Sequence, residues 1–477
     1  MDLLEQFQPI FFPRSVAIVG ASPDQTKIGT RFLQHYLNAG FKGRVYAVNP
    51  CGGRILGVEA YPRVSAIPDA VDLVIVAIPR QFTLDLIEDC ARKGVKAVQM
   101  FTAGFSELGE EESRQLEAAL LQRAREAGIR LIGPNCIGVY SPAHNMPVET
   151  TGVLGEPGSV AFICQSGGFT EAVAEAGAVR GLRFSKVVSF GNGNDLGSVD
   201  FLEYLSVDPD TSIIGAYLEG VKEGRRLWQL AKDISRTKPL VIYKGGQTEA
   251  GAEAAASHTA ALAGSDEVWA AALKQAGAIK VQSIEELTDT LLAFQDLPPV
   301  AGRGVAIIGQ LGGGGGGISV SATDICVRYG FAVPEFSAQT KARLKAILPP
   351  VGYILRNPVD LSLGGNDPRV VGEALRLIAA EPGIDLIMVN ERVSFHLAFV
   401  SRETVHSVNE ALIEFRKRSA KPLVVVSPPG QAEEERRVVE GRLSRAGIPS
   451  FPTLERAVRA LVNVTSYWRF RAEMENA

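Results

Sequence analysis

Residues 16–37 read VAIVGASPDQTKIGTRFLQHYL, in which an apolar run is followed by a Gly-Ala-Ser turn and then by an amphipathic segment. This order predicts a β-strand, a tight turn and an α-helix. Such a turn directs backbone N–H groups and a helix N-terminus towards an anion, which makes Gly20, Ser22 and Lys27 candidate ligand-binding residues. The third glycine of the GxGxxG motif is missing, so the alternative is a tight turn that binds nothing.

The same alternation of apolar and amphipathic segments continues along nearly the whole chain. Amphipathic segments that end at glycine, such as residues 83–94 and 111–128, separate short apolar runs. These runs are expected to form strands at 44–50, 72–79, 97–104, 130–135, 159–169, 184–195, 212–221, 239–247, 304–317, 384–390, 422–429 and 448–453. Apolar strands joined by helices predict parallel sheets buried on both faces. We therefore expect an α/β fold of three consecutive Rossmann-like or flavodoxin-like parallel-sheet domains.

A Pro/Gly stretch at residues 294–304 has the composition of a linker. Together with the rhythm of the strands, it predicts three domains at 1–145, 146–300 and 301–477.

The composition excludes several classes of protein. Of the 477 residues, 46% are hydrophobic and 21% are charged, as in ordinary globular proteins. The net charge of −4 argues against a nucleic-acid partner. We find no signal peptide and no apolar run long enough to span a membrane, so we expect a cytoplasmic protein without a membrane partner. The five cysteines form no CxxC pair, and no metal site is expected.

Several polar or proline-bearing loops follow the strands of the first module. Because ligands bind beyond the carboxyl ends of parallel strands, these loops are expected to converge on one crevice. The predicted lining of an adenine and phosphate slot is Asn49, Pro50, Ile78, Pro79 and Asn135. Cys136 follows in the same kind of loop, either near a ligand thiol or as a small core residue.

The second module opens with another strand, turn and helix, ICQSGGFTEAVAEAG at residues 163–177. Its Gln165, Ser166, Gly167 and Gly168 are candidate phosphate-binding residues, because a Ser/Gly turn at a helix N-terminus offers N–H donors to an oxyanion. Glu219 ends a later strand. It is either a solvated carboxylate or the acceptor of an imidazole Nδ1 proton, which would leave Nε2 free to attack.

His258 lies in AGAEAAASHTAALAGSD, residues 250–266, where nearly every neighbour is small. Small side chains let a ligand approach the imidazole closely. The alanines allow a surface helix, but the bounding glycines and the lack of bulk favour a mobile loop. The other four histidines have ordinary contexts and are interpreted as structural.

Six consecutive glycines, Gly312–Gly317, stand between a strand and a helix of the third module. They fit an anion-binding nest, although the GK[ST] ending of a P-loop is missing. A close approach between domains explains them equally well.

Taken together, the motifs KGGQTEAGAEAAASHTAALAGSD, YLEG, VAIVGAS, GPNCIG and QSGG resemble those of the NDP-forming acyl-CoA synthetases, relatives of succinyl-CoA ligase. The resemblance runs from about residue 8 into the C-terminal region, and its most specific part surrounds His258. It implies that an acid, CoA and a nucleotide react through an acyl phosphate and a phosphohistidine. The matching catalytic residues are His258 and Glu219.

The resemblance implies that the first domain binds coenzyme A, that the second is ligase-like and that the third is flavodoxin-like. No ATP-grasp module is visible, and the three-module arrangement resembles the α subunit of split ADP-forming acetyl-CoA synthetases. The resemblance therefore implies a separate ATP-grasp β subunit that holds ATP or ADP and Mg²⁺. Two other functions stay open, namely a regulatory subunit that binds CoA or acyl-CoA, and an acyl or carbamoyl transferase that uses no nucleotide. The third-module sequence VNERVSFHLAFVSRE leaves the acid open.

Overall fold

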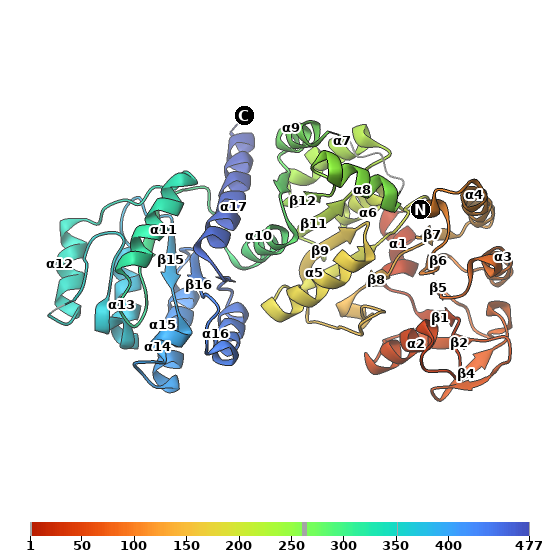
Figure 1. The fold of residues 1–477 in the computed structure, drawn as a ribbon, viewed down its shortest axis with the longest axis horizontal. Helices are drawn as coiled ribbons and strands as arrows, with labels where there is room; N and C mark the ends of the chain where they lie inside the picture. The colour runs from red at the N-terminus through yellow and green to blue at the C-terminus, as the bar shows by residue number, and fades with distance from the viewer. Residues whose placement is uncertain (1, 260–264, 351, 477) are drawn as a thin grey trace. The chain divides into compact units, whose positions relative to one another are not determined.

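The computed structural model describes residues 2–259, 265–350 and 352–476, with side chains omitted for residues 256–259 (Figure 1). The chain divides into two compact units, Met1–Leu287 and Thr288–Ala477. Within the described residues there are three mostly parallel sheets, with seven, six and four strands. The α/β fold with three consecutive domains expected from the strand-and-helix rhythm is thereby confirmed.

The first sheet has the strand order β3-β4-β2-β1-β5-β6-β7 and is parallel except for the β3–β4 hairpin. Its strands are β1 (Ser15–Val19), β2 (Arg44–Val48), β3 (Gly53–Ile55), β4 (Val58–Tyr61), β5 (Leu73–Val76), β6 (Ala97–Met100) and β7 (Arg130–Ile132). The accompanying helices are α1 (Leu3–Phe11), α2 (Ile28–Asn38), α3 (Thr83–Lys93) and α4 (Glu111–Glu126). All residues of β1, β5 and β6 are buried, because helices cover both faces of the sheet.

The second sheet has the order β13-β12-β11-β9-β10-β8, in which only β8 runs antiparallel to its neighbour. Its strands are β8 (Gly138–Tyr140), β9 (Pro157–Cys164), β10 (Phe184–Ser189), β11 (Ile213–Leu218), β12 (Leu240–Lys244) and β13 (Ile279–Val281). The helices that follow these strands are α5 (Gly167–Arg180), α6 (Ser198–Val207), α7 (Gly224–Ser235), α8 (Glu249–Thr259), α9 (Asp266–Ala276) and α10 (Ile284–Asp296).

One expectation about the second module is wrong. The backbone around His258 is helical, since α8 extends from Glu249 to Thr259. Alanine has the highest helix propensity, and here that propensity outweighs the flanking glycines. Residues 260–264, where the rest of the expected loop falls, lie outside the described residues.

The first two sheets share a continuous hydrophobic core. Apolar side chains of β1 and α2 belong to the same buried cluster as those of β9, β11 and α6. Helix α1 contributes to this junction, because the rings of Phe7 and Phe11 stack on Tyr204 of α6 with centroids 4.7 and 4.8 Å apart. The N-terminal module is therefore packed as part of a larger unit.

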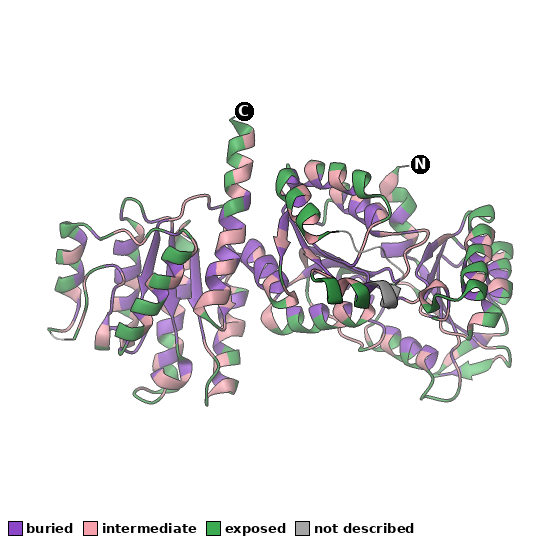
Figure 2. Ribbon diagram, turned by 45° about the horizontal axis from the view of Figure 1, so that its top comes forward, coloured by how far each residue is buried: buried purple, intermediate pink, exposed green. Residues whose placement is uncertain are grey.

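The second unit contains the parallel sheet β14-β15-β16-β17. Its strands are β14 (Val305–Ile308), β15 (Leu386–Asn390), β16 (Leu423–Val426) and β17 (Ser450–Phe451). Its helices are α11 (Gly316–Arg328), α12 (Ala338–Ile347), α13 (Pro368–Ala379), α14 (Val393–His396), α15 (Arg402–Arg418), α16 (Glu433–Arg445) and α17 (Leu454–Glu475). Figure 2 shows buried strands and helices whose outer sides are exposed, the expected pattern for sheets covered on both faces.

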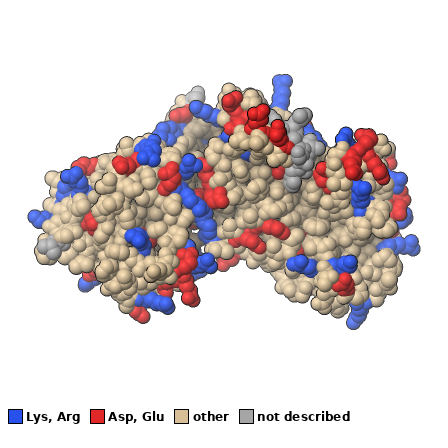
Figure 3. Space-filling model, viewed as in Figure 1, with Lys and Arg blue, Asp and Glu red and all other residues tan. Residues whose placement is uncertain are grey.

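The surfaces of the two units mix charges of both signs. On the face drawn in Figure 3, basic and acidic side chains are interspersed among uncharged ones. Among the described residues, no helix is both long and apolar enough to cross a membrane.

Candidate active site

Close backbone contacts hold the turn after β1 against the start of α2. Gly20 has a φ of +106°, and a Cβ there would lie 2.3 Å from the Ala77 carbonyl oxygen. A Cβ on Gly29 would lie 2.6 Å from the backbone of Gly20. Glycine is therefore required at both positions, which explains how this strand, turn and helix pack so tightly without a complete GxGxxG motif.

A first pocket of about 520 Å³ lies at the carboxyl ends of β1, β2 and β5. Four of the predicted residues, Gly20, Pro50, Ile78 and Pro79, line it. Its cations, Arg63 and Arg92, were not predicted from the sequence. Both arginines lie in segments that look ordinary until the fold brings them to this edge, so no local signal reveals them.

A second pocket of about 630 Å³ lies between the first two sheets of the N-terminal unit. Ile78 and Pro79 line both pockets, so the predicted single crevice consists of two adjoining ones. The second pocket brings together Asn135 and Cys136 from the first sheet's loops with four residues of the second module. Those four are Gln165, Ser166, Gly167 and Gly168.

Asn135 lies where the two modules touch. Its φ is +59°, and a Cβ on Gly191, in the loop after β10, would lie 2.3 Å from the Asn135 carbonyl oxygen. This close approach places the loop that carries Asn135 and Cys136 against the second sheet. It requires glycine at position 191.

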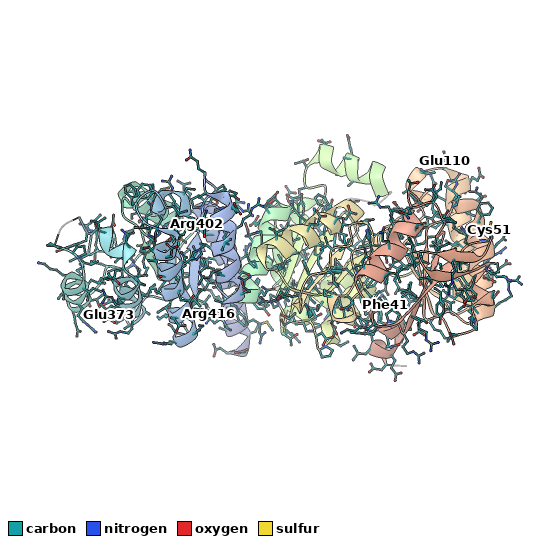
Figure 4. All side chains as sticks on the ribbon, turned by 90° about the horizontal axis from the view of Figure 1, so that it is seen from below. Phe41, Cys51, Glu110, Glu373, Arg402 and Arg416 are labelled. Atoms are coloured by element: carbon teal, nitrogen blue, oxygen red, sulfur yellow. The ribbon has the colours of Figure 1, made fainter. Side chains whose placement is uncertain are left out.

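The thiol of Cys136 points into the pocket wall. Cys136 is 3% exposed, and its Sγ donates to the carbonyl oxygens of Met100 and Ile132 at 3.4 and 3.5 Å. Burial raises the pKa of this thiol far above its ordinary value. The contacts are those of a small core residue, the alternative considered for this cysteine. Of the five cysteines, Cys51 is exposed, at the periphery of its unit in Figure 4.

Three predicted residues of the first module lie outside the linings of both pockets. The Asn49 side chain donates to the Ala21 carbonyl oxygen at 2.8 Å and accepts from the Cys51 N–H at 2.9 Å. Ser22 Oγ accepts from the Asp24 N–H at 3.2 Å, and Lys27 is exposed. Asn49 therefore joins the turns after β1 and β2.

Helix α5 points its N-terminus at the second pocket. Ser166 is the N-cap, and its Oγ accepts from the Phe169 N–H at 3.5 Å. Gly167 and Gly168 occupy the first turn, where N–H groups have no partner within a helix. The helix has 14 residues, and its dipole adds partial positive charge at this end. The turn is suited to binding an oxyanion.

Glu219 is held in a network that links three strand ends. It is 4% exposed and directly follows β11. Its Oε1 accepts from the Tyr217 hydroxyl at 3.3 Å, and its backbone N–H donates to Gln165 Oε1 at 3.1 Å. A Cβ on Gly245, just after β12, would lie 2.5 Å from the Tyr217 hydroxyl oxygen. Tyr217 and Gly245 were not predicted, although both stand in the YLEG and KGG motifs.

The side chain of His258 lies outside the described residues. Its pairing with Glu219 therefore stays a prediction, and so does its role as a nucleophile. The described backbone places His258 near the C-terminal end of α8, the helix that follows β12.

The glycine run of the second unit is packed against aromatic side chains. Gly312, Gly313 and Gly314 have φ values of +85°, +93° and +76°. A Cβ on Gly312 would lie 2.8 Å from His396 Cδ2. The His396 ring is fully buried, and its nitrogens contact Glu391 Oε1 at 3.1 Å and Asn366 Oδ1 at 2.9 Å. These contacts show why glycine is needed at 312, and they agree with a structural role for His396.

Another cavity, of about 760 Å³, lies between α13 and α15 of the second unit. Charged surface side chains line much of it, including Glu373, which Figure 4 labels. None of the predicted site residues lines this cavity. It carries no functional assignment.

Comparison with known proteins identifies each module. Residues 14–142 match a CoA binding domain, residues 157–294 a succinyl-CoA ligase like flavodoxin domain, and residues 305–474 a Ligase-CoA domain. These three matches define the class as proteins assembled from CoA-binding and CoA-ligase domains.

Two curated relatives and one solved structure cover nearly the whole chain. The ADP-forming acetate–CoA ligase I subunit alpha of Pyrococcus furiosus is 36% identical over 472 residues, with 98% of each chain covered. The ADP-forming acetate–CoA ligase I of Archaeoglobus fulgidus is 36% identical over 464 residues, and the match spans 97% of this chain but 64% of that enzyme. The structure of dinucleotide-forming acetyl-coenzyme A synthetase 1 from Ca. Korarchaeum cryptofilum, in complex with phosphate and ADP, has a TM-score of 0.84 at 32% identity and covers 98% of both chains.

The chain belongs to the ADP-forming acyl-CoA ligase family, within which its domains are succinyl-CoA ligase-like. The resemblance inferred from the motifs is thereby confirmed.

Proposed function

We propose that this chain is the α subunit of an NDP-forming acid–CoA ligase. The reaction interconverts a carboxylic acid, CoA and ATP with an acyl-CoA, ADP and phosphate. The observation that carries the proposal is the second pocket, where the oxyanion-binding turn of α5 faces residues of the CoA-binding domain. The chain also matches, along its length, the P. furiosus relative that is named subunit alpha, which supports the same assignment.

The chemistry proceeds by three balanced transfers. A nucleoside triphosphate gives its terminal phosphoryl group to His258 Nε2, forming a P–N bond and releasing the diphosphate. An oxygen of the acid then attacks phosphorus, the P–N bond breaks, and an acyl phosphate forms. The CoA thiolate attacks the acyl carbon, which expels phosphate and leaves the thioester. A labile P–N bond and a nucleophilic imidazole suit histidine to this task.

The chain's own residues have distinct parts in this scheme. The N–H groups of Gly167 and Gly168 neutralise the phosphoryl oxygens at the α5 N-terminus. Glu219, oriented by Tyr217, accepts the Nδ1 proton of His258 and so fixes the tautomer. CoA enters from the first pocket, where Arg63 meets its phosphates while Arg92 is paired with Asp89 at 3.0 Å. Its thiol end passes Ile78 and Pro79 to reach the second pocket.

The nucleotide and Mg²⁺ are assigned to an ATP-grasp β subunit. The name subunit alpha of the P. furiosus relative supports a separate partner. The longer A. fulgidus enzyme, of which this chain spans 64%, is consistent with the same parts joined in one polypeptide. We place the complex in the cytoplasm.

The two alternatives are not favoured. A regulatory CoA-binding subunit and a transferase without nucleotide require neither the α5 turn nor the Glu219 network. The relatives that cover the chain are named as ligases.

Phosphorylation of His258 tests the proposal. Given acyl-CoA and radioactive phosphate, the chain alone should acquire an acid-labile, base-stable phosphate, since this half-reaction needs no nucleotide. ATP-dependent thioester synthesis should appear only when the β subunit is added. His258→Ala should abolish both activities. ATP-dependent synthesis by the chain alone would contradict the assignment of the nucleotide site and would direct attention to Gly312–Gly317.

A further inference from the structure

The charge of the second pocket restricts the acid. Among its described lining residues there is no lysine, arginine or histidine, and Glu171 is the charged one. The rest of the wall is apolar or neutral, with Ile28, Phe101 and Ile137 providing large apolar side chains. A second carboxylate on the substrate would find no cation here, and it would be repelled by Glu171.

Glu171 stands one helical turn beyond the oxyanion-binding end of α5. Residues four apart lie on the same side of a helix, so Glu171 follows Gly167 on the face that lines the pocket. One turn rises 5.4 Å, which matches a short acyl chain that starts at the helix N-terminus. The reacting carboxylate and Glu171 would thus meet opposite ends of one substrate.

Two polar groups in this wall are open to a ligand. Glu171 is half-buried and has no hydrogen bond or ion pair with any described residue. The Thr150 Oγ1 atom is buried and also lacks a hydrogen-bond partner in the described structure. By contrast, the Thr102 hydroxyl donates to the Ile78 carbonyl oxygen at 2.7 Å. An ionised carboxylate can only accept hydrogen bonds, so the open side of Glu171 selects a donor.

We infer that the acid is a monocarboxylate longer than acetate whose far end carries a hydrogen-bond donor, a hydroxyl or an ammonium group, received by Glu171. The inference rests on the proposed function, because the acid's carboxylate is placed at the α5 N-terminus. The separation of one helical turn between Gly167 and Glu171 supports an acid longer than acetate.

Four acids of equal chain length test the inference, namely butyrate, 4-hydroxybutyrate, 4-aminobutyrate and succinate. Their far ends are a methyl, a hydroxyl, an ammonium and a carboxylate group. Binding to the full chain with CoA present is measured by calorimetry, and kcat/KM is measured with the β subunit added. A hydrogen bond to a charged group contributes about 1.5–3 kcal/mol, so the preferred donor acid should exceed butyrate by at least about 10-fold. Succinate should be the poorest.

Two matched variants locate the effect. Glu171→Met should reduce the preference for the donor acid over butyrate to within about 2-fold, because the acceptor is gone. Glu175→Met changes an exposed glutamate one turn further along α5 and should leave the preference intact. The ratio of kcat/KM for 4-hydroxybutyrate to kcat/KM for 4-aminobutyrate identifies whether the substrate carries a hydroxyl or an ammonium group.

Equal or tighter binding of butyrate, or a preference for succinate, would overturn the inference. The same holds if the preference survives Glu171→Met. Failure of the proposed function looks different, because no acid would yield a thioester and His258 would acquire no phosphate, while the binding comparison would still report on Glu171.

Discussion

At the scale of single residues, the Tyr217 hydroxyl is one partner of the Glu219 carboxylate. Tyr217 donates to its Oε1 at 3.3 Å, and both side chains are buried. Tyr217→Phe removes this donor without changing the ring, so we expect phosphorylation of His258 to slow by about 10-fold, the lower end for a bond to a charged group.

Glu219→Gln should slow the phosphorylation of His258 further, by about 10²–10⁴-fold, with CoA affinity unchanged.

Tyr243 provides the matched control for this pair. Its ring lies 5.2 Å from that of Tyr217, and it is on the neighbouring strand β12. Tyr243→Phe should leave the phosphorylation rate within about 2-fold of the original, well inside the range of one hydrogen bond. The rate at which the chain incorporates inorganic phosphate in the presence of acyl-CoA is measured for both variants. Equal losses in both tyrosine variants would reduce Tyr217 to a packing residue.

A second residue-scale prediction concerns Glu149, a buried carboxyl between the first two sheets. It is 1% exposed, Gln99 Nε2 donates to its Oε2 at 2.5 Å, and the Tyr36 hydroxyl donates to its Oε1 at 3.3 Å. Burial raises the pKa of Glu149 from 4.5 to about 8. Between these values the unfolded chain releases the proton while the folded chain keeps it, so stability falls as the pH rises through this window.

Glu149→Gln should abolish this part of the pH dependence. Each pKa unit corresponds to about 1.4 kcal/mol, so the variant should gain a few kcal/mol relative to the original chain between pH 4.5 and pH 8. Thermal unfolding midpoints at pH 5 and pH 8 measure the difference. Glu156→Gln, at an exposed glutamate nearby, should follow the original chain at both values. An equal change in unfolding midpoint between pH 5 and pH 8 for Glu149→Gln and the original chain would contradict the assigned pKa.

At the scale of elements, α2 is held against β1 by the absence of a side chain at Gly29. A Cβ there would lie 2.6 Å from the Gly20 backbone, so Gly29→Ala must push the helix away from the turn that lines the first pocket. We expect CoA affinity to fall by at least about 10-fold, or roughly 1.4 kcal/mol. Calorimetry measures it, with Gly224→Ala as the control, since a Cβ there meets its nearest atom at 3.9 Å. Equal CoA affinity in both variants would show that the turn tolerates the shift.

The elements also show how far local patterns reach. The apolar runs predicted most strands of the three sheets, because a strand buried on both faces is apolar throughout. The antiparallel β8, the β3–β4 hairpin and the edge strand β13 were missed, since each strand has three or four residues and pairs through contacts that no local pattern records. The segment of His258 was assigned to a loop, but its described part, up to Thr259, belongs to α8.

At the scale of the whole molecule, the first two sheets are packed into one compact unit. The stacking of Phe7 and Phe11 on Tyr204 belongs to a core shared between them. A fragment of residues 1–145 would expose that core, so we expect it to aggregate or to lack a cooperative unfolding transition. The unit Met1–Leu287, expressed alone, should unfold cooperatively and bind CoA as tightly as the full chain. Cooperative unfolding of 1–145 with full CoA affinity would show that the N-terminal module stands alone.

The candidate site was only partly predictable. Gln165, Ser166, Gly167 and Gly168 were proposed because a Ser/Gly turn before a helix is a local pattern; they line the second pocket, and their binding of phosphate stays a prediction. Asn49 was assigned to ligand binding, but its side-chain amide joins two turns. This contact depends on Ala21, which is 28 residues away in the sequence. Arg63, Arg92 and Glu171 reach the pockets through packing alone.

The sequence by itself determined the alternation of buried strands and covering helices, the family, and the turns that can bind anions, because each depends on residues close together in the chain. Only the tertiary structure decided that two pockets share Ile78 and Pro79, that the Cys136 thiol faces the core, and that Glu171 stands uncompensated in the wall of the second pocket. These features depend on contacts between side chains that are far apart in the sequence. Burial and pairing set the chemistry of those side chains, and no local sequence pattern records burial or pairing.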